Sequence, residues 1–84
     1  MRKNNNDASF NTAIGQWLAN KREEKKLSQQ EVADMLKVSK TAVSYWETGK
    51  RTIYAVNMMN YCEVLGVNPQ DLVSDLKNKR KTGK

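Results

Sequence analysis

Apolar residues recur along most of this sequence at intervals of three and four, the spacing of one face of a helix. These recurrences fall into five windows, which we predict to be short helices: Thr12 to about Lys25, 29–36, 40–48, Ala55 to Leu65 and 69–76. The side chains that we expect in the core are Ile14, Leu18, Val32, Ala33, Leu36, Val43, Trp46, Met58, Met59, Cys62 and Leu65. No stretch alternates with the period of two that a strand requires. The pattern predicts an all-α fold, a compact bundle of five short helices.

Short polar motifs mark the ends of these windows. Ser28 and Glu31 have the spacing of a capping box, in which each side chain accepts a hydrogen bond from the other residue's backbone N–H. We expect Ser39 to cap the third window, and Asn68, followed by Pro69, to cap the fifth. Two glycines stand where a helix needs a left-handed residue to end: Gly49 and Gly66.

The two ends of the chain differ from its middle in composition. Residues 1–11 hold three consecutive asparagines and little that is apolar before Phe10, so we expect a disordered N-terminal arm. Residues 77–84 are rich in lysine and arginine, and we expect a basic, disordered tail. The sequence therefore predicts one domain over residues 12–76.

The charge balance favours a polyanionic partner, but only weakly. The 84 residues include 15 Lys and Arg and 9 Asp and Glu, which gives a formal net charge of +6. Most of this excess lies in the two ends, because the middle of the chain is close to neutral. A specific site therefore has to be argued from pattern.

Composition also excludes several classes of function. The chain has no histidine and a single cysteine, Cys62, so it lacks an internal disulfide and the usual zinc ligands. We find no Gly-rich phosphate loop and no paired carboxylates, and we expect no enzymatic activity, no metal or other cofactor and no small-molecule ligand. No apolar run approaches the roughly 20 residues that span a bilayer, and no signal-peptide pattern is present. We expect a cytoplasmic protein without a membrane partner.

Residues 29–48 have the layout of a helix-turn-helix: a short helix, a turn of about three residues and a second short helix. A small side chain is needed where the two helices cross, and Ala33 supplies it. The outward face of the second helix has to be polar and short enough to enter a major groove about 12 Å wide. That face carries Lys40, Thr41, Ser44, Tyr45 and Thr48.

The sequence resembles one known family in four stretches: LSQQEVA (27–33), LKVS (36–39), VSYWETGKR (43–51) and LGV (65–67). This is the Cro/phage-repressor family of helix-turn-helix domains, also described as lambda-repressor-like or XRE-type. The resemblance covers about residues 12–76. It implies a small globule of five helices that binds operator DNA, usually as a two-fold dimer, and that represses or activates transcription.

The resemblance also implies roles for individual residues. Base contacts would come from Lys40, Thr41, Ser44 and Tyr45, with Ser44 at the margin. Phosphate contacts would come from Gln29, Lys50 and Arg51, and Gln29 would also brace Lys40. Arg22 and Glu47 match an ion pair of the family that ties the first helix to the end of the recognition helix.

The chain departs from the family pattern at four positions. Lys26 and Lys37 stand where glycine is common, so we expect two non-glycine residues in the left-handed conformation, at a cost of roughly 1 kcal/mol each. Ile53 replaces a proline that often opens the fourth helix, and Lys21 occupies a position that is usually apolar.

Two functions are carried forward from the sequence. The first is a sequence-specific DNA-binding transcriptional regulator, most simply a repressor, that binds double-stranded operator DNA as a homodimer. The alternative is a protein-interaction module, antitoxin-like or regulator-binding, with weak or no DNA binding. Its interaction surface would be the last helix and the tail. Lys40 and Tyr45 would then be an ordinary solvated helix face. The apolar stripe of Leu72, Val73 and Leu76 fits either core or dimer interface, and the position of Trp17 is equally open.

Overall fold

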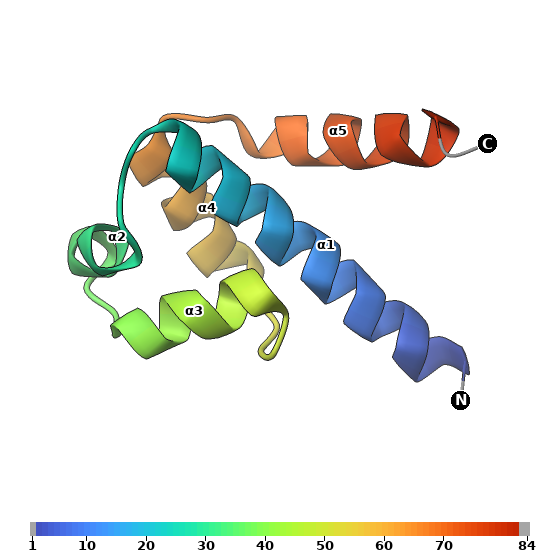
Figure 1. The fold of residues 1–84 in the computed structure, drawn as a ribbon, viewed down its shortest axis with the longest axis horizontal. Helices are drawn as coiled ribbons and strands as arrows, with labels where there is room; N and C mark the ends of the chain where they lie inside the picture. The colour runs from blue at the N-terminus through green and yellow to red at the C-terminus, as the bar shows by residue number, and fades with distance from the viewer. Residues whose placement is uncertain (1, 83–84) are drawn as a thin grey trace.

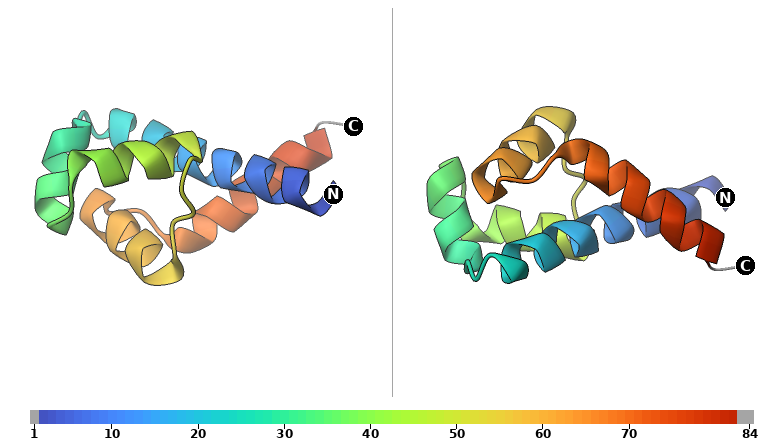
Figure 2. Two further views of the ribbon diagram at one scale, coloured as in Figure 1. Left: turned by 90° about the horizontal axis from the view of Figure 1, so that it is seen from below. Right: turned by 90° about the horizontal axis from the view of Figure 1, so that it is seen from above.

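The computed structural model describes the backbone of residues 2–82 and the side chains of residues 10–78. Within this part of the chain, five α-helices follow one another (Figure 1), and no strand is present. Their bounds are α1 Arg2–Glu24, α2 Gln29–Leu36, α3 Lys40–Thr48, α4 Ala55–Leu65 and α5 Pro69–Thr82. The start of α1 and the end of α5 lie at the same end of the long axis (Figure 2), away from α2. The predicted all-α class is confirmed.

Local capping explains why the inner helix bounds agree with the sequence. At α2, the N–H of Glu31 donates to Ser28 Oγ at 3.0 Å and the N–H of Ser28 donates to Glu31 Oε1 at 2.8 Å, the predicted capping box. The N–H of Ala42 donates to Ser39 Oγ at 3.0 Å at the start of α3. Gly49 and Gly66 end α3 and α4 with φ of 81° and 72°.

Two lysines occupy the left-handed region, as predicted. Lys26 has φ 61° and Lys37 has φ 60°. Each ends a helix where the chain must turn sharply into the next one, so the fold imposes a conformation that a β carbon disfavours.

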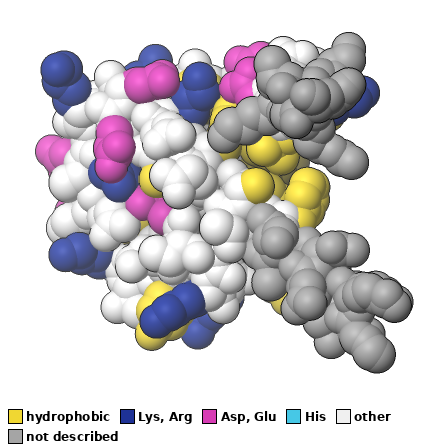
Figure 3. Space-filling view, turned by 45° about the vertical axis from the view of Figure 1, so that its right-hand side comes forward, with side chains coloured by type: hydrophobic (Ala, Val, Ile, Leu, Met, Phe, Trp, Pro, Cys, Tyr) yellow, Lys and Arg dark blue, Asp and Glu magenta, His cyan; other side chains and the backbone are white. Residues whose placement is uncertain are grey.

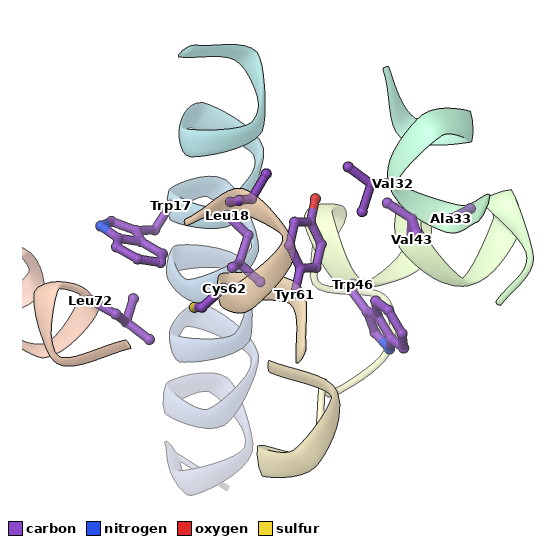
Figure 4. Close-up of a cluster of buried hydrophobic side chains, with 10 residues drawn as sticks. Trp17, Leu18, Val32, Ala33, Val43, Trp46, Tyr61, Cys62 and Leu72 are labelled. Atoms are coloured by element: carbon purple, nitrogen blue, oxygen red, sulfur yellow. The ribbon is translucent and has the colours of Figure 1, made fainter. Parts of the chain in front are cut away.

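The core lies where all five helices meet (Figure 4). Its buried side chains are Trp17, Leu18, Val32, Ala33, Val43, Trp46, Tyr61, Cys62, Leu65 and Leu72. Trp17 joins this core at 7% exposure, and its indole Nε1–H donates to Asp75 Oδ2 at 2.7 Å, which links α1 to α5. The prediction that Met59 is buried is wrong, because its side chain is 57% exposed. The core-facing side of α4 runs through Met58, Tyr61, Cys62 and Leu65, at i, i+3, i+4 and i+7, and this spacing leaves Met59 on the outer side.

The outer helices are longer than the sequence predicts. α1 begins at Arg2 and not at Thr12, and α5 continues to Thr82, so helical backbone occupies stretches for which disorder is expected. Neither stretch contains proline or glycine, and each added residue of a preformed helix gains a hydrogen bond. Asn11 also donates from Nδ2 to Thr52 Oγ1 at 2.9 Å, which ties this part of α1 to the loop after α3. The domain limits of 12 and 76 stay a prediction.

Candidate nucleic-acid interface

Helices α2 and α3 form the helix-turn-helix, packed through side chains that have lost all contact with solvent. Val32 and Ala33 of α2 and Val43 of α3 are each 0% exposed. The turn between the helices is closed by a hydrogen bond from the N–H of Val38 to the carbonyl oxygen of Ala33, at 3.0 Å. The small Ala33 therefore lies in the core beside the turn, as the pattern requires.

The outward face of α3 is polar. Lys40, Thr41 and Thr48 are exposed, and Ser44 and Tyr45 are partly exposed. The opposite face, formed by Val43, Trp46 and Glu47, is buried. All four residues proposed for base contacts, Lys40, Thr41, Ser44 and Tyr45, are thus accessible on one helix.

α3 is held against α1 at very short range. A β carbon placed on Gly15 would collide with the carbonyl oxygen of Trp46 and would lie 2.5 Å from the carbonyl oxygen of Glu47. Gly49, at the end of α3, is similarly close to Thr12. Gly15 was not predicted as a packing residue; its only signal in the sequence is its position inside a helical window, where glycine is costly without a packing reason.

A buried polar network fixes α3 to three other helices. Arg22 of α1 donates from Nε to Glu47 Oε2 at 2.8 Å and from Nη2 to Oε1 at 3.0 Å. Gln29 of α2 donates from Nε2 to Glu47 Oε1 at 2.9 Å, and the Tyr61 hydroxyl of α4 donates to Oε2. Arg22 Nη1 also donates to the carbonyl oxygen of Leu27 at 2.8 Å. The Arg22–Glu47 pair implied by the family resemblance is therefore present, within a larger network.

These contacts shift the pKa values of the three ionisable side chains in the network, Glu47, Arg22 and Tyr61. Burial raises the pKa of the Glu47 carboxyl, but the hydrogen bonds from Arg22, Tyr61 and Gln29 outweigh it, so the pKa lies below its ordinary value. The hydrogen bond to Glu47 raises the pKa of the Arg22 guanidinium despite burial. Burial and the neighbouring carboxylate raise the pKa of the Tyr61 phenol far above its ordinary value. The network is therefore an ionised carboxylate surrounded by donors.

One predicted site residue, Gln29, differs in detail from expectation, and one residue of the network was not predicted. The Gln29 amide braces Glu47 and not Lys40, because the start of α2 faces the carboxylate at the end of α3. The side chain remains partly exposed, and its nitrogen carries a second hydrogen that could serve a phosphate. Tyr61 was missed altogether, since nothing in its window distinguishes it from the apolar residues beside it.

Beyond the glycine that ends α3, two basic residues lie against Tyr45. Lys50 Nζ lies 5.4 Å from the centre of the Tyr45 ring, and Arg51 Cζ lies 5.4 Å from the same point. Both distances fall within the range of a cation–π contact. Two of the three proposed phosphate contacts, Lys50 and Arg51, thus form a single cluster with Tyr45, a proposed base contact.

The apolar stripe of α5 divides between core and surface. Leu72 is 5% exposed and belongs to the core, Leu76 is partly buried against it, and Val73 is 56% exposed. Apolar side chains gather toward the α1 and α5 end on the face shown in Figure 3, whereas Lys and Arg are interspersed with Asp and Glu over the rest. Of the three candidates for a dimer interface, Val73 is the most accessible.

Comparison with known proteins agrees with this geometry. A family model described as helix-turn-helix matches residues 18–72. Among curated proteins, none matches the chain significantly in sequence. Within the described residues, no helix is long and apolar enough to cross a membrane.

Solved structures of two regulators share the fold. Two crystal structures of ClgR, the clp gene regulator of Corynebacterium glutamicum, match with TM-scores of 0.76 and 0.79 at 24% and 22% identity. The first match covers 81% of this chain and 87% of the ClgR chain. The second covers 87% of this chain and 78% of the ClgR chain. The restriction-modification controller protein C.AhdI of Aeromonas hydrophila matches with a TM-score of 0.73 at 28% identity, over 76% of this chain and 97% of its own.

The fold and the exposed face of α3 define a helix-turn-helix DNA-binding domain. The chain belongs to the Cro/phage-repressor (XRE-type) class of the helix-turn-helix family, whose members are DNA-binding transcriptional regulators and not enzymes.

Proposed function

We propose that the chain is a sequence-specific regulator that inserts α3 into the major groove of an operator. The observation that carries this proposal is the division of α3 into a buried face and an exposed polar face. Lys40, at the first position of α3, would donate to the O6 and N7 atoms of guanine, and Thr41 would offer a hydroxyl and a methyl group to the neighbouring base. Ser44 and Tyr45 would complete the base contacts.

Phosphates on either side of the groove would be held by Gln29, Lys50 and Arg51. Within residues 10–78, neither Lys50 nor Arg51 forms an ion pair with a carboxylate, so their charge is free to neutralise phosphate. The second amide hydrogen of Gln29 would serve the same purpose at the start of α2. These contacts would orient α3 without reading sequence.

A single helix of nine residues reads only a few base pairs. Specific affinity therefore requires two domains on half-sites about one helical turn apart, and we propose a homodimer. Bound across a promoter, such a dimer would exclude polymerase, so repression is the simplest outcome. C.AhdI and ClgR are themselves named as a controller protein and a gene regulator.

Selection of bound sequences from a random duplex pool tests this proposal. We expect an enriched palindrome whose half-sites are separated by about one helical turn, about 10 base pairs. Failure to enrich any sequence, together with no salt-dependent binding to duplex DNA, would favour the protein-interaction module instead. The exposed apolar Val73 on α5 is the feature that such a module would use.

A further inference from the structure

We propose that Tyr45 is a positioning residue, whose ring holds Lys50 and Arg51 against the DNA-facing side of α3. These two basic side chains form a phosphate clamp, which the ring orders before DNA binds. This proposal rests on the proposed function, which assigns phosphate contacts to the same two residues. This role is separate from the base contact proposed for Tyr45, because its loss would weaken binding to every duplex sequence.

The backbone brings the two cations to the ring. Gly49 takes the left-handed conformation with φ 81°, which turns the chain back at the end of α3. The N–H of Arg51 then donates to the carbonyl oxygen of Tyr45 at 3.3 Å, so the loop closes on the residue that carries the ring. Lys50 and Arg51 therefore return to Tyr45 although they follow it by several positions.

Among residues 10–78, the ring is the one partner that the structure gives to either side chain. Both cations lie 5.4 Å from its centre, and both are exposed. No carboxylate among the described residues forms an ion pair with them. A long basic side chain in water samples many rotamers, and fixing it on binding costs entropy. A ring that already restricts these rotamers lowers that cost while leaving the positive charge for phosphate.

Tyr45 is the apt residue for this role because its ring is only partly exposed. Tyr45 is partly buried, and its ring remains within reach of both Lys50 and Arg51. Tyr54 makes a contrast: it is 72% exposed, and no Lys or Arg among the described residues stacks on it. Tyr54→Leu is therefore the matched control for Tyr45→Leu.

The first arm of the test needs no DNA. In the free protein, the ε protons of Lys50 should show upfield ring-current shifts relative to those of Lys37, and the δ protons of Arg51 should show them relative to Arg51 in the urea-unfolded chain, both measured by NMR. Tyr45→Phe should keep these shifts, Tyr45→Leu should abolish them, and Tyr54→Leu should leave them unchanged. Shifts equal to those of Lys37 in the wild type would overturn the proposal.

The second arm measures binding to a random-sequence duplex at low salt. Tyr45→Leu should weaken this binding by about three- to tenfold, the effect of one or two exposed cation–π contacts, and Tyr45→Phe should not. In a Lys50→Gln/Arg51→Gln background, Tyr45→Leu should cause no further loss. Loss confined to a selected sequence, or an equal loss in Tyr45→Phe, would overturn the positioning role.

The two arms separate this proposal from the function on which it rests. If the wild type binds no duplex at any salt concentration, the DNA-binding function fails and the clamp fails with it. If the wild type binds DNA but the cations are not held on the ring, only the positioning role fails. Thermal unfolding of each variant controls for loss of fold.

Discussion

Gly15 of α1 packs directly against the backbone of Glu47 in α3: a β carbon on Gly15 would lie 2.5 Å from the Glu47 carbonyl oxygen and 2.7 Å from the carbonyl carbon. Backbone atoms cannot move aside as the end of a flexible side chain can. The close approach also places the Arg22 and Glu47 side chains within hydrogen-bonding distance. The position of α3 therefore depends on Gly15, a residue without a side chain.

Gly15→Ala should separate α1 from α3. We expect a loss of about 1–3 kcal/mol in the free energy of unfolding, because an added methyl group in a closely packed contact forces the backbone apart. Urea unfolding followed by Trp fluorescence measures this loss. Gly66→Ala is an informative comparison, since a β carbon there meets nothing within 4 Å and only its φ of 72° opposes the change. A Gly15→Ala protein as stable as the wild type would contradict the packing described here.

Arg22→Ala should be strongly destabilising, by about 3–5 kcal/mol, because it leaves the buried Glu47 carboxylate without its cation. The double variant Arg22→Met/Glu47→Leu removes both charges. We expect it to be more stable than Arg22→Ala, since no unpaired charge remains. Denaturant unfolding measures the free energy of unfolding of both variants. A double variant less stable than Arg22→Ala would contradict the view that the unpaired carboxylate is the main cost.

Acid should destabilise the fold through Glu47. Its pKa is lowered in the folded protein, so its contribution is complete above the pKa of the unfolded chain, about 4.3, and is lost as the pH falls through the lower folded value. The difference in unfolding free energy between wild type and Glu47→Gln should therefore shrink between about pH 5 and the folded pKa. A difference that stays constant down to pH 3 would contradict the network's ionised state.

Lys37→Gly should stabilise the turn of the helix-turn-helix by about 0.5–1 kcal/mol, because glycine adopts its φ of 60° without the β-carbon penalty. Lys26→Gly should act similarly. Lys25→Gly is the matched control: Lys25 is not among the residues with positive φ, so glycine there should only cost entropy. Thermal unfolding of the three variants distinguishes these outcomes. A loss of stability in Lys37→Gly would contradict the claim that the left-handed conformation of Lys37 is strained.

Local signals made much of the fold predictable. The starts of α2 and α3 follow from Ser28 and Ser39, and the ends of α3 and α4 follow from Gly49 and Gly66, because caps act within a few residues of the chain. The left-handed conformation of Lys26 and Lys37 was expected from the family resemblance, because the two lysines occupy helix ends where glycine is common in the family.

Contacts between distant residues could not be predicted in the same way. Periodicity places Tyr61 in a helix but does not reveal that its hydroxyl reaches Glu47 of α3. The hydrogen bond from Trp17 to Asp75 joins the first helix to the last, and no local pattern encodes it. Nor does the spacing of Tyr45, Lys50 and Arg51 show that the turn at Gly49 stacks both cations on the ring. Such relationships arise only when the helices pack.

Groove insertion of α3 is tested most directly by the binding of Lys40→Ala to a selected palindrome and to a random duplex under the same salt conditions, with Lys50→Ala beside it. Lys40→Ala should lose about 1–3 kcal/mol on the palindrome and little on the random duplex, which would relax specificity at one position. Lys50→Ala should weaken both equally and lower the salt slope by about 1. Equal losses on both duplexes for Lys40→Ala would contradict base recognition by this helix.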